Sequence, residues 1–316
     1  MRIKKVLKYF GFLIALIPFA SAACSSGYDR PHGLKPRYIL DGTQESISGN
    51  FVYYSINGDT EYAVALKESA KSITTTITIN STYNNKPVTG IWRYGFANSK
   101  ASAVNIPSGI TVIDYEAFMG SKIKSVTIPA TIDQIGEAAF YACKDLTKAS
   151  IQNTTTTSEA SSACSCIEVV ENDEEERIPC SLTNIPAFCF FNCHALKELV
   201  LPQSIEEIEY EAFNNCKALY STLAFMNIKA IRSRAFQNCE QLKNVYISSS
   251  FFAKDPQTNE PVGVIEDKAF DKCNTNLKFW LVGDTSAVQD WLDLHTDNKW
   301  RWKDETLNPA INAYTY

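Results

Sequence analysis

Hydrophobic residues recur along this chain in a repeating unit, most simply recognised as an isoleucine followed five positions later by a phenylalanine. The phenylalanines of the seven units are Phe96, Phe118, Phe140, Phe190, Phe213, Phe236 and Phe270. An alanine precedes the phenylalanine in five units, and a cysteine follows it by three residues in the last five. A register kept over so many units predicts a repeat architecture in which equivalent segments stack.

Each unit also contains a short stretch in which apolar and polar residues alternate. In residues 122–129, Val126 and Ile128 fall on one face and a proline ends the stretch; residues 196–202 and 242–247 repeat the pattern. Alternation with a period of two residues indicates a half-buried β-strand. One unit cannot bury its own apolar side chains, so the units are expected to share a core by stacking.

We therefore expect a β-rich repeat solenoid with a parallel β-sheet on its concave face and irregular or short helical turns on its convex face. The seven units fill residues 88–282, with loop insertions near 152–180 and 248–262. Residues 50–87 are predicted to form an N-terminal β cap, in which segments 51–56 and 77–80 are hairpin strands. Residues 283–316 are predicted to form a C-terminal cap.

The repeat resembles that of the BspA-like leucine-rich-repeat family. The family pattern is similar to Cys-x2-Leu-x2-Val-x-Ile-Pro-x2-Ile-x2-Ile-x3-Ala-Phe-x2-Cys, which residues 125–143 fit closely. The first two units depart from it, because Ser99 and Ser121 replace the cysteine. The resemblance implies a leucine-rich-repeat arc and a bacterial surface protein, and several members of the family are adhesins for host proteins.

The first 23 residues have the features of a signal peptide, with basic residues, then an apolar run, then small residues at 21–23. Cys24 follows where a bacterial lipoprotein is acylated, although Ser21 departs from the usual lipobox. We expect a membrane-anchored lipoprotein at the cell surface, with residues 24–49 as a lipid-anchored tether. The alternative is ordinary secretion.

Composition narrows the function further. A net charge of −5 and 45% hydrophobic residues fit neither a disordered chain nor a nucleic-acid-binding one, and the sequence shows no basic patch. The three histidines and the carboxylates match no catalytic or metal-binding motif. We therefore predict no catalytic residues, metal or cofactor, and no nucleic-acid partner.

The ten cysteines fall into groups with different expectations. The repeat places five at equivalent core positions, as a ladder of buried thiols: Cys143, Cys193, Cys216, Cys239 and Cys273. Their parallel Cβ directions disfavour disulfides between neighbouring units. Four others lie in or beside the first insertion, where one or two disulfides would fix it, with free thiols as the alternative: Cys164, Cys166, Cys180 and Cys189. Their spacing does not match a structural zinc site.

The strand register also predicts a binding surface. If Val126 and Ile128 face the core, the alternate residues face outward, and the same register can be extended along the array. The outward strip so obtained contains Thr127, Glu198, Val200, Leu223, Asn244, Tyr246, Phe279 and Leu281. Its C-terminal half is apolar, which commonly marks a partner site; alternatively, a cap or the 248–262 insertion covers it.

Together these features predict a non-enzymatic binding protein at the cell surface. The leading hypothesis is an adhesin that binds a host or neighbouring-cell protein through the sheet. A structural, self-associating envelope protein is the alternative, and a secreted enzyme is a remote third.

Overall fold

The computed structural model describes residues 38–152, 182–253, 256–257, 262–282 and 312–314. All of them belong to one compact body that begins at Pro36. Within these ranges the regular structure consists of β-strands and two short 3₁₀ helices, η2 (Glu68–Ser72) and η3 (Ser249–Phe252). The protein is thus a β-rich repeat solenoid, as the alternating pattern predicts.

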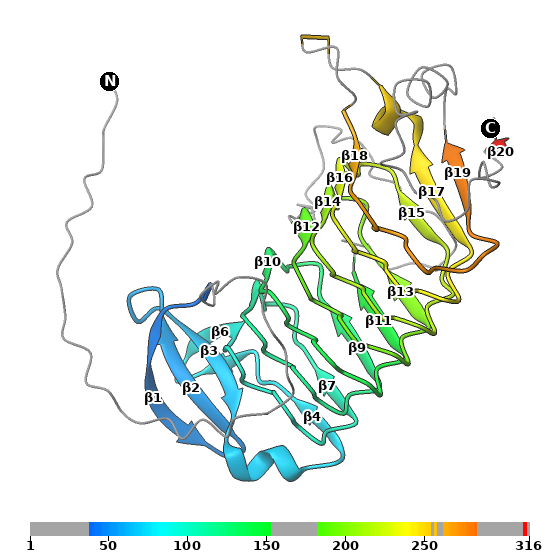
Figure 1. Cartoon of the computed structure of the whole chain (residues 1–316). Coiled ribbons are helices and arrows are strands. Elements are labelled where there is room, and N and C mark those ends of the chain that lie inside the picture. The colour runs from blue at the N-terminus through cyan, green and yellow to red at the C-terminus, as the bar shows by residue number, and fades with distance from the viewer. Residues whose placement is uncertain (1–37, 153–181, 254–255, 258–261, 283–311, 315–316) are drawn as a thin grey trace, which may run out of the picture. The chain divides into compact units, whose positions relative to one another are not determined.

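The longer strand of each unit joins a row of parallel strands, which lie side by side in Figure 1. The first sheet of this row contains β4 (Thr76–Thr78), β7 (Ala103–Asn105), β9 (Ser125–Ile128), β11 (Lys148–Ile151) and β13 (Glu198–Val200). The second contains β15 (Leu223–Phe225), β17 (Asn244–Ser248), β19 (Lys278–Val282) and β20 (Asn312–Tyr314). Between the two sheets, the Ser221 hydroxyl accepts a hydrogen bond of 2.8 Å from the Leu199 backbone N–H.

A second row is formed by short parallel strands: β8 (Val112–Ile113), β10 (Gln134–Ile135), β12 (Asn184–Ile185), β14 (Glu207–Ile208), β16 (Ala230–Ile231) and β18 (Val264–Ile265). At its N-terminal end, β8 pairs with β6 (Lys86–Ile91), and β6 pairs in parallel with β3 (Glu61–Leu66) and antiparallel with β5 (Thr82–Tyr83).

The N-terminal cap is an antiparallel sheet of β1 (Gly42–Ser48), β2 (Phe51–Ile56) and β3. The prediction that residues 77–80 contribute a hairpin strand is wrong. Ile77 lies in β4, which pairs in parallel with β7. β4 is therefore the first strand in the row of longer strands, and Ile77 and Ile79 are buried in the core that the units share.

The core is organised around a stack of the seven repeat phenylalanines. Consecutive ring centroids from Phe96 to Phe270 are 5.0–5.3 Å apart, and the rings are close to parallel. The first six side chains are fully buried. Each unit therefore supplies one ring to a continuous column, which confirms that the Ile-x4-Phe segments are equivalent rungs. We number units one to seven from Phe96 to Phe270.

The turns around these phenylalanines are irregular because two backbone positions in each turn are left-handed. In unit five these positions are Glu211 (φ 52°) and Asn215 (φ 63°), on either side of Phe213. Asparagine tolerates this conformation better than most residues, and it recurs at the second position in four units: Asn98, Asn192, Asn215 and Asn238.

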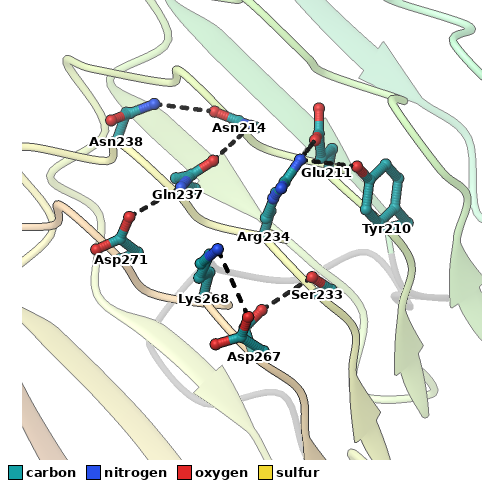
Figure 2. A network of polar contacts seen from close by, with 10 residues as sticks. All are labelled: Tyr210, Glu211, Asn214, Ser233, Arg234, Gln237, Asn238, Asp267, Lys268 and Asp271. Atoms are coloured by element: carbon teal, nitrogen blue, oxygen red, sulfur yellow. Dashed lines mark hydrogen bonds and ion pairs between the residues drawn. The ribbon is translucent and has the colours of Figure 1, made fainter. Parts of the chain in front are cut away.

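Polar side chains link the turns of the C-terminal units, as Figure 2 shows. The Arg234 guanidinium donates to the Tyr210 hydroxyl and to the Glu211 carboxylate, each at 3.1 Å. The Asn238 amide donates to Asn214 at 3.2 Å. Because each bond joins side chains of successive units, these contacts help to fix the separation of the turns.

The repeat cysteines connect successive units by weak hydrogen bonds. Each thiol donates to the backbone carbonyl of the phenylalanine in the preceding unit, with sulfur–oxygen distances of 3.1–3.3 Å: Cys143, Cys193, Cys216, Cys239 and Cys273. All five are free thiols, four of them buried and Cys273 partly so. The serines that replace cysteine in units one and two, Ser99 and Ser121, are also fully buried.

These thiols are expected to resist alkylation while the protein is folded. Burial raises the pKa values of Cys193, Cys216 and Cys239 well above that of an ordinary cysteine, and only the thiolate attacks iodoacetamide. At pH 8, peptide mass spectrometry is expected to find these three unmodified in native protein and modified after unfolding. Modification of Cys216 in the native state, as fast as in the unfolded chain, would contradict the buried position.

Candidate functional site: the outward face of the long strands

Two columns of side chains point outward from the long strands, because alternate strand residues face opposite sides of a sheet. In one column, Thr127, Ser150 and Val200 lie on paired positions of β9, β11 and β13. In the second sheet, which begins at β15, the same column continues through Ala224, Tyr246 and Trp280. We call this outward surface the long-strand face.

The structure places five of the predicted residues on this face. Val200 is 51% exposed. Thr127 is exposed, and Glu198, Asn244 and Tyr246 are partly exposed. The second outward column runs through Ser125, Lys148 and Glu198 in the first sheet, and through Asn244 and Lys278 in the second.

The other three predicted residues do not belong to the outward column. Leu223 and Phe279 are core residues, only 2% and 6% exposed. Leu281 pairs with Ile247, which is buried, whereas Trp280 occupies the position opposite Tyr246. The predicted continuous apolar strip is therefore wrong in these units, and the face carries Ala224 and Trp280 instead.

A one-residue difference in spacing explains both errors. Leu199 follows Leu196 by three positions, but the equivalent Leu223 follows Leu219 by four. Likewise, Leu242 follows Cys239 by three positions, but Leu277 follows Cys273 by four. Because side chains alternate across a strand, a shift of one residue moves every side chain to the opposite face.

The C-terminal end of the long-strand face carries an aromatic pair. The rings of Tyr246 and Trp280 are stacked, with centroids 5.8 Å apart and planes 15° from parallel. The Trp280 indole N–H donates to the Asn244 side-chain oxygen at 2.9 Å, and the Lys278 ammonium lies 5.9 Å from the indole ring. Aromatic rings held in place among polar groups are typical of the energetically important residues of protein interfaces.

The centre of the face is charged. The Lys148 ammonium lies 2.9 Å from the Glu198 carboxylate, which also accepts a hydrogen bond of 3.4 Å from the Tyr220 hydroxyl. The contact with Lys148 lowers the pKa of Glu198, and the same contact raises the pKa of Lys148. Tyr220 is 54% exposed, so the pair adjoins another accessible aromatic ring.

Sequence reasoning missed Trp280 and Tyr220. Trp280 has a usable signal, because it follows Cys273 by seven residues, as Tyr246 follows Cys239. Counting from the cysteine would have identified it. Tyr220 follows Cys216 by four residues, and the residues at this position in other units, Thr147, Lys197 and Lys243, are also exposed, so the repeat predicts its exposure.

Cys189 is not part of a disulfide. It is a free, fully buried thiol, so its predicted role in fixing the insertion is wrong. Cys189 immediately precedes Phe190, where other units have a core alanine such as Ala139 or Ala212. Cys164, Cys166 and Cys180 lie outside the described residues, as does Cys24.

Neither a metal-binding cluster nor a membrane-spanning helix occurs in the ranges that the structure describes. In those ranges, no three His, Cys, Asp or Glu side chains are grouped so that they could hold a metal ion. The same ranges contain no helix of the length and hydrophobicity needed to cross a membrane.

Comparison with known proteins finds a family model that matches most of this chain. The model for the BspA-type leucine-rich repeat region matches residues 69–173 and 169–278, with six copies of the repeat. No curated protein matches.

Several solved structures resemble the chain. A leucine-rich repeat protein from Eubacterium ventriosum is 21% identical (TM-score 0.45) over 71% of this chain and 50% of that protein. A Treponema pallidum leucine-rich repeat protein is 19% identical (TM-score 0.49) over 66% of this chain and 88% of that one. A leucine-rich cell surface protein from Faecalibacterium prausnitzii is 17% identical (TM-score 0.28) over 79% and 97%. The chain thus spans half the length of the Eubacterium protein.

Proposed function

Because this chain belongs to the BspA-type leucine-rich repeat family, we propose that it is a non-enzymatic binding protein exposed at the cell surface. We infer that it acts as an adhesin and binds a protein of a host or of a neighbouring cell. The long-strand face is the binding surface in this proposal. Binding there would require no bond-making step, only burial of apolar area and polar complementarity.

One observation carries the proposal: the long-strand face exposes apolar and aromatic side chains on a rigid sheet. Val200 and Tyr220 are each more than half exposed, and the Tyr246–Trp280 pair lies two strands further along. Val200 and the stacked rings lose little entropy when a partner covers them, because a strand and the ring stack already hold them. The parallel sheet of a repeat protein is also the surface that such folds commonly use for binding.

The surface location rests on the sequence. The signal-peptide features of residues 1–23, followed by Cys24, support export and acylation. Acylation would anchor the protein stably once more than one chain is attached. Intact-mass measurement of the membrane fraction tests this part, because a mature chain that begins at an unmodified residue other than Cys24 would contradict it.

The binding role is tested by replacing apolar side chains of the long-strand face with negatively charged ones. The double variant Val200→Glu with Tyr246→Glu is expected to bind a purified extracellular-matrix protein captured by the wild type at least about 30-fold more weakly, since the loss of even one central residue that contributes about 2 kcal/mol has this effect. Surface plasmon resonance against a panel of such proteins measures this loss.

The matched control is the double variant Ile47→Glu with Val264→Glu. Both side chains are exposed apolar residues, at 60% and 45%, and neither lies on a strand of the long-strand face. It is expected to bind as the wild type does, and circular dichroism checks the folding of both variants. If both variants lose binding equally, the long-strand face is not the site. If the wild type captures nothing but self-associates with concentration in sedimentation velocity, the structural envelope role replaces the adhesin.

A further inference from the structure

A column of exposed basic side chains, four lysines and one histidine, runs along the units on a different part of the surface. Each member stands four residues after the repeat phenylalanine, in units one to five: Lys100, Lys122, Lys144, His194 and Lys217. All five are exposed. In units six and seven the same position holds Glu240 and Asn274. We call these five residues the basic ridge.

The stacking of the units sets the spacing of the ridge. The Lys122 backbone N–H donates to the Ser99 carbonyl at 2.8 Å, and the Ala218 N–H donates to the His194 carbonyl at 3.3 Å. These bonds keep ridge segments of consecutive units adjacent, and the phenylalanine rings of those units repeat every 5.0–5.3 Å. The ridge therefore offers a lysine on four of five rungs and a histidine on the remaining one.

The positive charge of the ridge is only weakly compensated. Lys122 lies 3.4 Å from Asp145 and Lys217 lies 3.2 Å from Glu240, but all four side chains are about half exposed. Exposed ion pairs have small interaction energies because water screens them, so both lysines stay available to an anionic ligand. Among the described residues, Lys100 and Lys144 form no ion pair, nor do the exposed Lys124 and Lys197 next to the ridge.

The titration of His194 agrees with a positive potential along the ridge. Burial lowers the pKa of His194, and the charges of Lys144 and Lys217, one unit away on either side, lower it further. The prediction of no basic patch is therefore wrong. The sequence shows none because the ridge residues are separated by 22 to 50 positions, and only the stacking of units brings them together.

We propose that the basic ridge binds a linear anionic polysaccharide, such as a sulfated or uronic-acid glycan, laid along the stack of units. A single line of basic side chains, one per rung with a lysine on four of the five, matches a chain that carries its charges at intervals close to one sugar residue. Duplex DNA carries a charge about every 1.7 Å of its axis, much denser than the ridge. The net charge of −5 disfavours binding of a polyanion elsewhere on the protein.

The proposal concerns a surface other than the long-strand face, and its test leaves that face unchanged. The double variant Lys100→Gln with Lys144→Gln is expected to bind heparin about 25-fold more weakly at low ionic strength, since each lysine facing an anionic surface contributes roughly fivefold. The control, Lys229→Gln with Lys268→Gln, removes two exposed lysines off the ridge. It is expected to bind within about twofold of the wild type.

Isothermal titration calorimetry at several salt concentrations measures these affinities. A wild type that does not bind heparin at low salt overturns the proposal, and so does an equal loss in the two variants. Tighter binding to a DNA duplex of equal length assigns the ridge to a different partner and overturns it as well.

His194 provides a second readout that a purely structural role of the lysines would not move. A polyanion seated on the ridge favours the charged imidazolium, so heparin is expected to raise the pKa of His194. NMR titration of the imidazole protons, with and without heparin, measures this shift, and a His194→Gln variant assigns the signal. An unchanged pKa at saturating heparin contradicts binding on the ridge.

Discussion

Replacing Phe213 with alanine is expected to lower the free energy of unfolding by about 3–5 kcal/mol. The Phe213 ring is fully buried and stacked between Phe190 at 5.3 Å and Phe236 at 5.1 Å. Its removal leaves a cavity that the neighbouring units cannot close, because backbone hydrogen bonds such as Phe213 N–H to Ala235 carbonyl, at 2.8 Å, fix the rung spacing. Urea denaturation followed by circular dichroism measures the change.

A second aromatic residue of the same region serves as a control. It shows whether the loss of stability comes from the phenylalanine stack or from the removal of any aromatic ring. Phe191 neighbours the ring column but is only partly buried, with Tyr141 stacked on it at 5.2 Å. Phe191→Ala is expected to cost less, about 1–2 kcal/mol, because the site is partly open to solvent and its truncation leaves no closed cavity. If the two substitutions cost the same, the phenylalanine column is not the centre of the core.

The contrast between these two residues shows why the stack could be predicted from sequence. Each phenylalanine must meet its counterpart in the next unit, so the register of the Ile-x4-Phe segment is conserved within the chain from Phe96 to Phe270. No such constraint holds the loop before each long strand. The loop before β15 contains one extra residue, before Leu223. A fixed repeat length therefore predicts the wrong outward residues for β15.

Surface features were harder to predict for a related reason. Cys189 stands directly before its repeat phenylalanine, where other units have a buried alanine, and this repeat position alone predicts that it lies in the core. The basic ridge has no local signature, since Lys100 and Lys217 are far apart in the chain. Its positive potential exists only because successive units place equivalent residues about one rung apart.

Gly136→Ala is the second substitution with a large expected effect, about 3 kcal/mol of lost stability, at the upper end of the range for overpacking. A Cβ at this position would lie 2.4 Å from the Tyr115 backbone nitrogen and 2.7 Å from the Asp114 carbonyl carbon. These are backbone atoms of the preceding unit, so no side-chain rotation can relieve the contact. Gly136 also donates its N–H to the Ile113 carbonyl at 2.7 Å, which holds the two units together at this point.

The displacement would be transmitted to the N-terminal cap through Asp114. The buried Asp114 carboxylate accepts hydrogen bonds from the Ile39 and Leu40 backbone N–H groups, at 2.8 and 3.3 Å, and so fixes the segment that precedes β1. Gly109→Ala is the matched control, because no atom lies within 4 Å of a Cβ built there. It is expected to be neutral or slightly stabilising, since alanine restricts the unfolded chain. Thermal unfolding compares the two, and equal stability of both variants would mean that neighbouring rungs do not approach each other as closely as the structure shows.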